Sequence, residues 1–78
     1  MPTVLKIKGY RFFFYSNEGN EPIHIHIEKS ESYAKFWLNP IRIGIDTGFN
    51  SKEIKEIYSI IEEHQEHITE KWDEYFAR

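Results

Sequence analysis

Two histidines two positions apart have the spacing in this sequence that most directly suggests chemistry. His24 and His26 lie in residues 23–28, where apolar and polar side chains alternate strictly, as in a half-buried strand. Side chains at i and i+2 of a strand point to the same side, about 6–7 Å apart. Because imidazole titrates near neutral pH, one ring could accept the proton of a ribose 2′-hydroxyl while the other protonates the leaving oxygen. With Lys35 or Arg11 stabilising the developing charge, these four side chains predict a ribonuclease site.

The same two histidines allow two other interpretations. They could share a metal ion, with Glu28 or Asp46 as a third ligand and a partner completing the site. Alternatively, they are ordinary polar side chains on an exposed or partner-covered sheet face. The sequence indicates no cofactor, since its glycines match no phosphate-binding loop. It contains no cysteine, which excludes disulfides, thiolate zinc sites and thiol nucleophiles.

A predicted hairpin positions the histidines against the following strand. Its expected pairs are Glu28 with Tyr33, His26 with Lys35, and His24 with Trp37. One face of the sheet then gathers imidazoles, cations and aromatic rings, namely Arg11, Phe13, Tyr15, His24, His26, Glu28, Tyr33, Lys35 and Trp37. Aromatic rings stack on RNA bases, and arginine and lysine neutralise phosphates. This face therefore predicts RNA or partner binding by its four aromatic side chains.

The whole pattern predicts a single α+β domain over residues 1–78, with strands at about 3–46 and one helix at about 51–76. Lys8 and Gly9 form the expected turn of a first hairpin, and residues 41–46 alternate as a last strand, which gives four or five antiparallel strands. Asn50 and Glu53 have the spacing of a capping box at the start of the helix. The apolar stripe of this helix is expected to pack on the isoleucine-rich face of the sheet.

The predicted helix is long for its domain. Residues 51–76 would span about 39 Å, whereas a domain of this size has a diameter of about 30 Å. We therefore expect one of two outcomes. Either the helix extends beyond the sheet and exposes Trp72, Tyr75 and Phe76 to a partner or a second copy, or it kinks near Thr69 and folds back.

The charge is mildly acidic and unevenly distributed. The net charge is −3, with six basic and five acidic side chains in residues 1–50 but four basic and eight acidic ones in residues 51–78. An RNA partner is thus expected to meet the first part of the chain. No apolar run approaches the length of about 20 residues needed to cross a membrane, so we expect a soluble, cytoplasmic protein without membrane contacts.

Several motifs together resemble one family. They are MPTVL at residues 1–5, GYRFFFYSNE at 9–18, EPIHIHI at 21–27, AKFWL at 34–38 and WDEYF at 72–76. This set resembles the domain-of-unknown-function 4160 family of small prokaryotic proteins, whose members usually have proline at the position of Ile23. Members are often encoded beside a small protein of the domain-of-unknown-function 2442 family. The resemblance thus implies a partner protein and a toxin–antitoxin-like pair, with RNA as a target, but no established catalytic residue.

These observations predict a component of a toxin–antitoxin-like module that contacts a partner protein and RNA through the histidine-containing face. The alternative is a non-catalytic protein-interaction module, and the third hypothesis is a metal-binding module.

Overall fold

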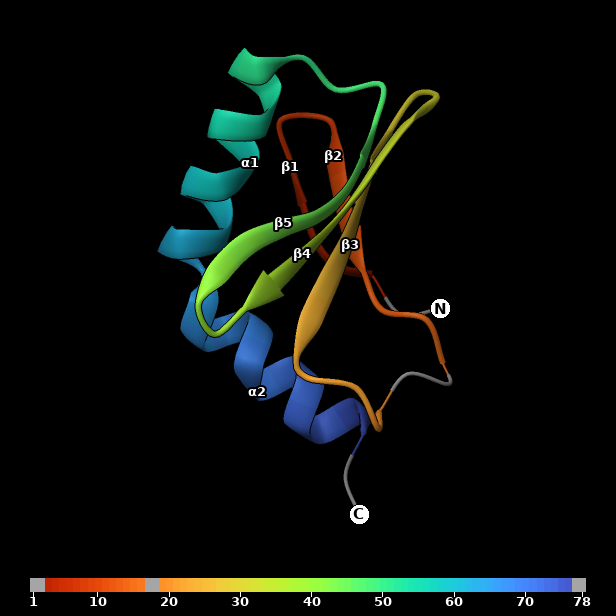
Figure 1. Cartoon of the computed structure of the whole chain (residues 1–78). Coiled ribbons are helices and arrows are strands. Elements are labelled where there is room, and N and C mark those ends of the chain that lie inside the picture. Colours follow the sequence, from red (N-terminus) through yellow and green to blue (C-terminus); the bar gives the residue numbers. More distant parts are fainter. Residues whose placement is uncertain (1–2, 17–18, 77–78) are drawn as a thin grey trace.

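The fold is a five-stranded antiparallel sheet followed by two helices (Figure 1). The computed structural model describes residues 3–16 and 19–76. The strands are β1 (Thr3–Ile7), β2 (Tyr10–Phe13), β3 (His24–Lys29), β4 (Ser32–Leu38) and β5 (Ile41–Thr47), and they lie side by side in chain order. They are followed by α1 (Ser51–Glu63) and α2 (Gln65–Tyr75). The α+β class and the antiparallel sheet are as predicted, but two helices replace the single one.

The registers of the first two hairpins confirm the predicted pairings. At the first turn Lys8 and Gly9 both have positive φ, 55° and 85°, as a two-residue turn between twisted strands requires. Ile7 consequently lies opposite Tyr10. In the second hairpin the observed pairs include Glu28 with Tyr33, His26 with Lys35, and His24 with Trp37. The period-two pattern was sufficient for these registers because a slip by one residue would turn every apolar side chain outward.

The last strand departs from the predicted alternation. The register shifts between Phe36, which pairs with Ile43, and Lys35, which pairs with Ile45, so that Gly44 is an extra residue. Because directly paired residues share a face, Ile43 lies on the side of the apolar core and Ile45 on the side of Lys35. The expectation that residues 41–46 alternate without interruption is therefore wrong from Ile45 onward.

The helical segment breaks at His64, which ends α1 and precedes α2. The backbone N–H of His64 bonds to both Ile60 and Ile61, at 3.0 and 3.2 Å, and its ring Nδ1 donates to the Ile60 carbonyl at 3.0 Å. After the break, α2 runs along the end of the sheet, where Gln65 donates to the main-chain oxygen of Leu38 at 2.9 Å (Figure 1). The kink is thus real, but it lies five residues before the expected position at Thr69.

This break packs the end of the chain onto the core instead of extending it. Trp72 is only 8% exposed, and Phe76 packs against the same buried cluster. The ring of Phe14 lies 5.3 Å from Trp72 and 5.8 Å from Phe76 between centroids. Of the two outcomes expected for this segment, the chain therefore folds back, and of Trp72, Tyr75 and Phe76 only Tyr75, at 41%, is exposed. In the described part of the chain, neither helix is long and apolar enough to cross a membrane.

A hydrogen bond joins the start of the sheet to α1 and couples two ionisable groups. The hydroxyl of Tyr10, a residue buried in the core, donates to Glu56 Oε1 at 2.8 Å, while Lys8 Nζ lies 3.4 Å from Glu56 Oε2. Lys8, in the turn of the first hairpin, therefore reaches toward α1. Burial, and then the hydrogen bond to Glu56, raises the pKa of Tyr10 to about 12, and the same bond lowers the pKa of Glu56.

We expect Tyr10→Phe to raise the pKa of Glu56 toward its ordinary value, measured by NMR titration of the side-chain carboxyl. A carboxyl group whose folded pKa is lowered stabilises the fold above its unfolded pKa, and this stabilisation is lost as the pH falls through the folded pKa. The difference in unfolding free energy between wild type and Tyr10→Phe should therefore be largest near neutral pH and shrink in acid. Parallel stability profiles of the two proteins across this acidic range would contradict the coupling.

Candidate functional site

His24 is enclosed at the start of β3. Its side chain has no solvent exposure, and its Nδ1 lies 2.8 Å from the carbonyl oxygen of Pro22. Because a carbonyl can only accept, His24 Nδ1 donates this hydrogen bond. The indole rings of Trp37, from β4, and Trp72, from α2, cover it with centroids at 5.4 and 5.1 Å. Contact with Trp72 explains why His24 is buried although it points away from the isoleucine-rich core.

His26 is packed between aromatic rings of the neighbouring strands. Its ring stacks on Phe13 and on Tyr33, with centroid distances of 5.5 and 5.8 Å, and packs edge to face with Tyr15 at a centroid distance of 4.5 Å. Its Nδ1 is 2.6 Å from the Tyr33 hydroxyl. Only 2% of its surface is exposed. We refer to His24, His26, Phe13, Tyr15, Tyr33 and Trp37 as the histidine cluster.

The two histidines point to the same side of the sheet, as strand geometry predicted. Their ring centroids are 5.0 Å apart, and their planes are nearly perpendicular. On the opposite side, Ile25 and Ile27 enter the apolar core. The expected open surface around the imidazoles is nevertheless absent, because both rings are buried. Acid–base catalysis by this pair stays a prediction that would require the covering aromatic rings to move.

Each of the two predicted catalytic cations already has a carboxylate partner. Arg11 Nη1 lies 2.7 Å from Glu28 Oε1, and the guanidinium sits 4.4 Å above the centre of the Phe13 ring. Lys35 Nζ lies 3.2 Å from Glu21 Oε1 and 4.5 Å from the centre of the Trp37 ring. The charges of Arg11 and Lys35 are therefore largely offset, which weakens their attraction for phosphate.

The two residues predicted to complete a metal site are engaged in other contacts. Asp46 pairs with Ala34 on the core face, opposite to the histidines, and its Oδ1 accepts the backbone N–H of Phe49 at 3.3 Å. Glu28 binds Arg11. Among residues 3–16 and 19–76, no group of three or more histidine, aspartate or glutamate side chains could hold a metal ion.

The family model for the Domain of unknown function (DUF4160) matches residues 9–73. The chain belongs to this family. The matched region includes the whole histidine cluster, β5 and most of α2, and it confirms the resemblance inferred from the motifs. Comparison with curated proteins and with solved structures gives no match.

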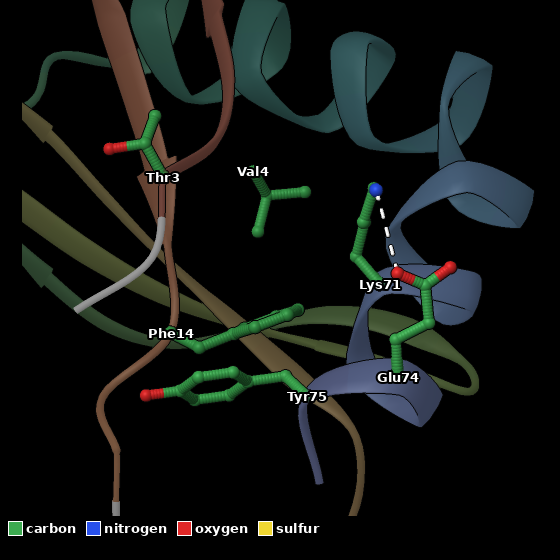
Figure 2. Close-up of a pocket in the computed structure, with 6 residues that line it drawn as sticks. All are labelled: Thr3, Val4, Phe14, Lys71, Glu74 and Tyr75. Carbon is green, nitrogen blue, oxygen red and sulfur yellow. Dashed lines mark ion pairs between the residues drawn. The ribbon is translucent and has the colours of Figure 1, made fainter. Parts of the chain in front are cut away.

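A pocket of about 370 Å³ lies away from the histidine cluster, between β1 and α2 (Figure 2). Its lining residues are Thr3, Val4, Phe14, Lys71, Glu74 and Tyr75. The rings of Phe14 and Tyr75 lie one above the other, and Lys71 pairs with Glu74 at 3.5 Å beside them on α2. Of the aromatic residues predicted for partner binding, only Tyr75 reaches this pocket. The sequence analysis did not predict this pocket, because its walls come from both ends of the chain.

Exposed apolar side chains gather on elements that the sequence analysis had not selected. Ile43 and Ile45 of β5 are 43% and 47% exposed, and Tyr58 of α1 is 41% exposed. An alternating strand is typically half-buried, yet residues 42–47 of β5 are all exposed. The one available sign in the sequence was Gly44, since a glycine within a strand indicates a bulge.

Proposed function

We propose that this protein is a non-catalytic binding module that acts by holding a partner protein. The observation that carries this proposal is the exposure of two large apolar side chains, Ile43 and Ile45, on a strand with no further strand beside it in the described part of the chain. Exposed apolar side chains on a small domain are typical of surfaces that another protein covers.

The histidine cluster supports this proposal because both of its imidazole rings are shielded from solvent. A general acid or base must come within hydrogen-bonding distance of the reacting atoms. His24 and His26 instead bond to Pro22 and Tyr33 and are covered by aromatic rings. In our proposal these imidazoles serve as polar, hydrogen-bonded parts of a second packed layer that keeps the sheet rigid.

The partner that we propose is a small protein of the domain-of-unknown-function 2442 family, as the family resemblance implies, in a toxin–antitoxin-like pair. We expect the two proteins, co-expressed from the same genome with a tag on one of them, to co-purify as a complex that survives size-exclusion chromatography at micromolar concentration. Separate elution of two folded proteins would contradict the proposal. Slowed growth on expression of this chain alone, relieved by the partner, would assign it the toxin role.

RNA binding is the second candidate function, and one observation favours it. Trp37 lies between two cations on the histidine side of the sheet, with Lys35 Nζ at 4.5 Å and the Arg42 guanidinium at 5.6 Å from its ring centre. Such a group can stack on a base and contact its phosphate. The purified complex tests this directly, since RNA bound here would dissociate steeply with added salt.

A further inference from the structure

We infer that the outer edge of β5 accepts an extended segment of the partner protein as a sixth strand. This segment carries apolar side chains toward both faces of the sheet and an acidic side chain next to Arg42. The inference rests on the proposed function and adds to it the binding surface and the chemistry of the occupant.

The two edge strands of the sheet differ in the side chains that they present. Natural edge strands commonly carry lysine, which prevents pairing with another chain. β1 follows this rule with Lys6, and Lys8 follows in its turn. β5 instead presents Ile43 and Ile45, both more than 40% exposed. The β5 edge is therefore the one suited to receive another strand.

The rotation of α1 places a third exposed apolar side chain beside this edge. Glu56 contacts Lys8 and Tyr10 and thus faces the β1–β2 hairpin, while Ile57 is fully buried against the sheet. Each residue turns an α-helix by about 100°, so Tyr58 lies on the opposite flank from Glu56. That flank faces β5, which is at the other end of the strand order and is in contact with α1.

The bulge at Gly44 determines which faces an added strand would cover. Ile43 shares the helix side with Tyr58, whereas Ile45 lies on the histidine side next to Lys35. An added segment must therefore present one apolar side chain to Ile43 and Tyr58 and another to Ile45. The sequence of such a segment contains consecutive apolar residues, unlike the alternating sequence of a strand with one exposed face.

The charge on this edge specifies the third feature of the segment. Arg42 is exposed on the histidine side and forms no ion pair with the described residues. An acidic side chain opposite it would gain a charge-assisted hydrogen bond. Arg42 and Asp46 are each two residues from Gly44. An antiparallel pair of two β5 strands centred on Gly44 would therefore place Arg42 of one copy opposite Asp46 of the other. However, the bulge places Arg42 and Asp46 on opposite faces of the sheet. Pairing between two copies of β5 would therefore not bring these opposite charges together.

The complex with the domain-of-unknown-function 2442 protein tests this surface. We expect Ile43→Lys and Ile45→Lys each to weaken binding at least about tenfold, because each introduces a charge into an apolar contact. The matched control is Tyr75→Lys, which changes an equally exposed apolar residue beside the pocket on α2. Its affinity should stay within about twofold of wild type. Amide hydrogen exchange in β5 should slow at least about tenfold in the complex.

Three results would overturn the inference. The first is a complex that forms with unchanged affinity in both isoleucine variants and leaves β5 exchange unaltered, in which case the proposed function stands without this surface. The second is a dimer of the free chain, seen by light scattering, that Ile45→Lys dissociates, because a second copy would then occupy the edge. The third is stronger binding in Arg42→Glu, because the facing side chain would then be basic.

Discussion

Replacing Trp72 by alanine should remove about 3–5 kcal/mol of folding free energy. Trp72 is 8% exposed and joins three parts of the structure, with ring centroids at 5.3 Å from Phe14, 4.3 Å from Phe76 and 5.1 Å from His24. Domains of this length have a total stability of roughly 4–12 kcal/mol. The variant should therefore be partly unfolded at 37 °C, as measured by urea denaturation and thermal melting.

Lys71→Ala is the matched control for this prediction. Lys71 precedes Trp72 on α2, and its ion pair with Glu74 is exposed, with 47% and 68% of the two side chains accessible. Pairs of this kind contribute about 0–1 kcal/mol. If Trp72→Ala lowers the free energy of unfolding no more than Lys71→Ala does, the packing of Trp72 against the end of the sheet does not stabilise the fold.

Replacing His26 by alanine should cost about 2–4 kcal/mol, although histidine is usually a surface residue. The substitution opens a cavity between Phe13, Tyr15 and Tyr33 and removes the hydrogen bond to the Tyr33 hydroxyl. Tyr33→Phe, which removes that bond but keeps the stacked ring, should cost about 1 kcal/mol. Denaturant unfolding of both variants measures the two losses.

Glu28→Ala serves as the control for His26→Ala, because Glu28 is two residues further on the same strand and face but has 46% of its side chain exposed. Its loss should stay below about 1 kcal/mol. If the role of His26 is structural, the amount of partner bound by His26→Ala should decrease only in proportion to the fraction of folded protein. A folded His26→Ala protein of wild-type stability that has lost an RNA-cleaving activity would instead show that His26 is catalytic.

The sequence by itself determined the local geometry of this protein. Alternation predicted the strand pairings of the first two hairpins and the common direction of His24 and His26, because neighbouring strand residues must point to opposite faces. The start of α1 was equally local, since Asn50 and Glu53 exchange hydrogen bonds across one helical turn, at 2.8 and 3.0 Å. Each of these features depends on residues close together in the chain or on a single strand pairing.

The tertiary structure alone decided burial on the histidine side of the sheet and exposure at β5. His24 became inaccessible because the break at His64 brings Trp72 back to the start of β3, 48 positions earlier in the sequence. Ile45 became exposed because the bulge at Gly44 moves it to the opposite face of a strand that has no outer neighbour in the described residues. Burial depends on which distant segments meet, and strand alternation carries no information about that meeting. The histidines that suggested chemistry are therefore enclosed, whereas two isoleucines of the alternating last strand lie exposed at the edge of the sheet.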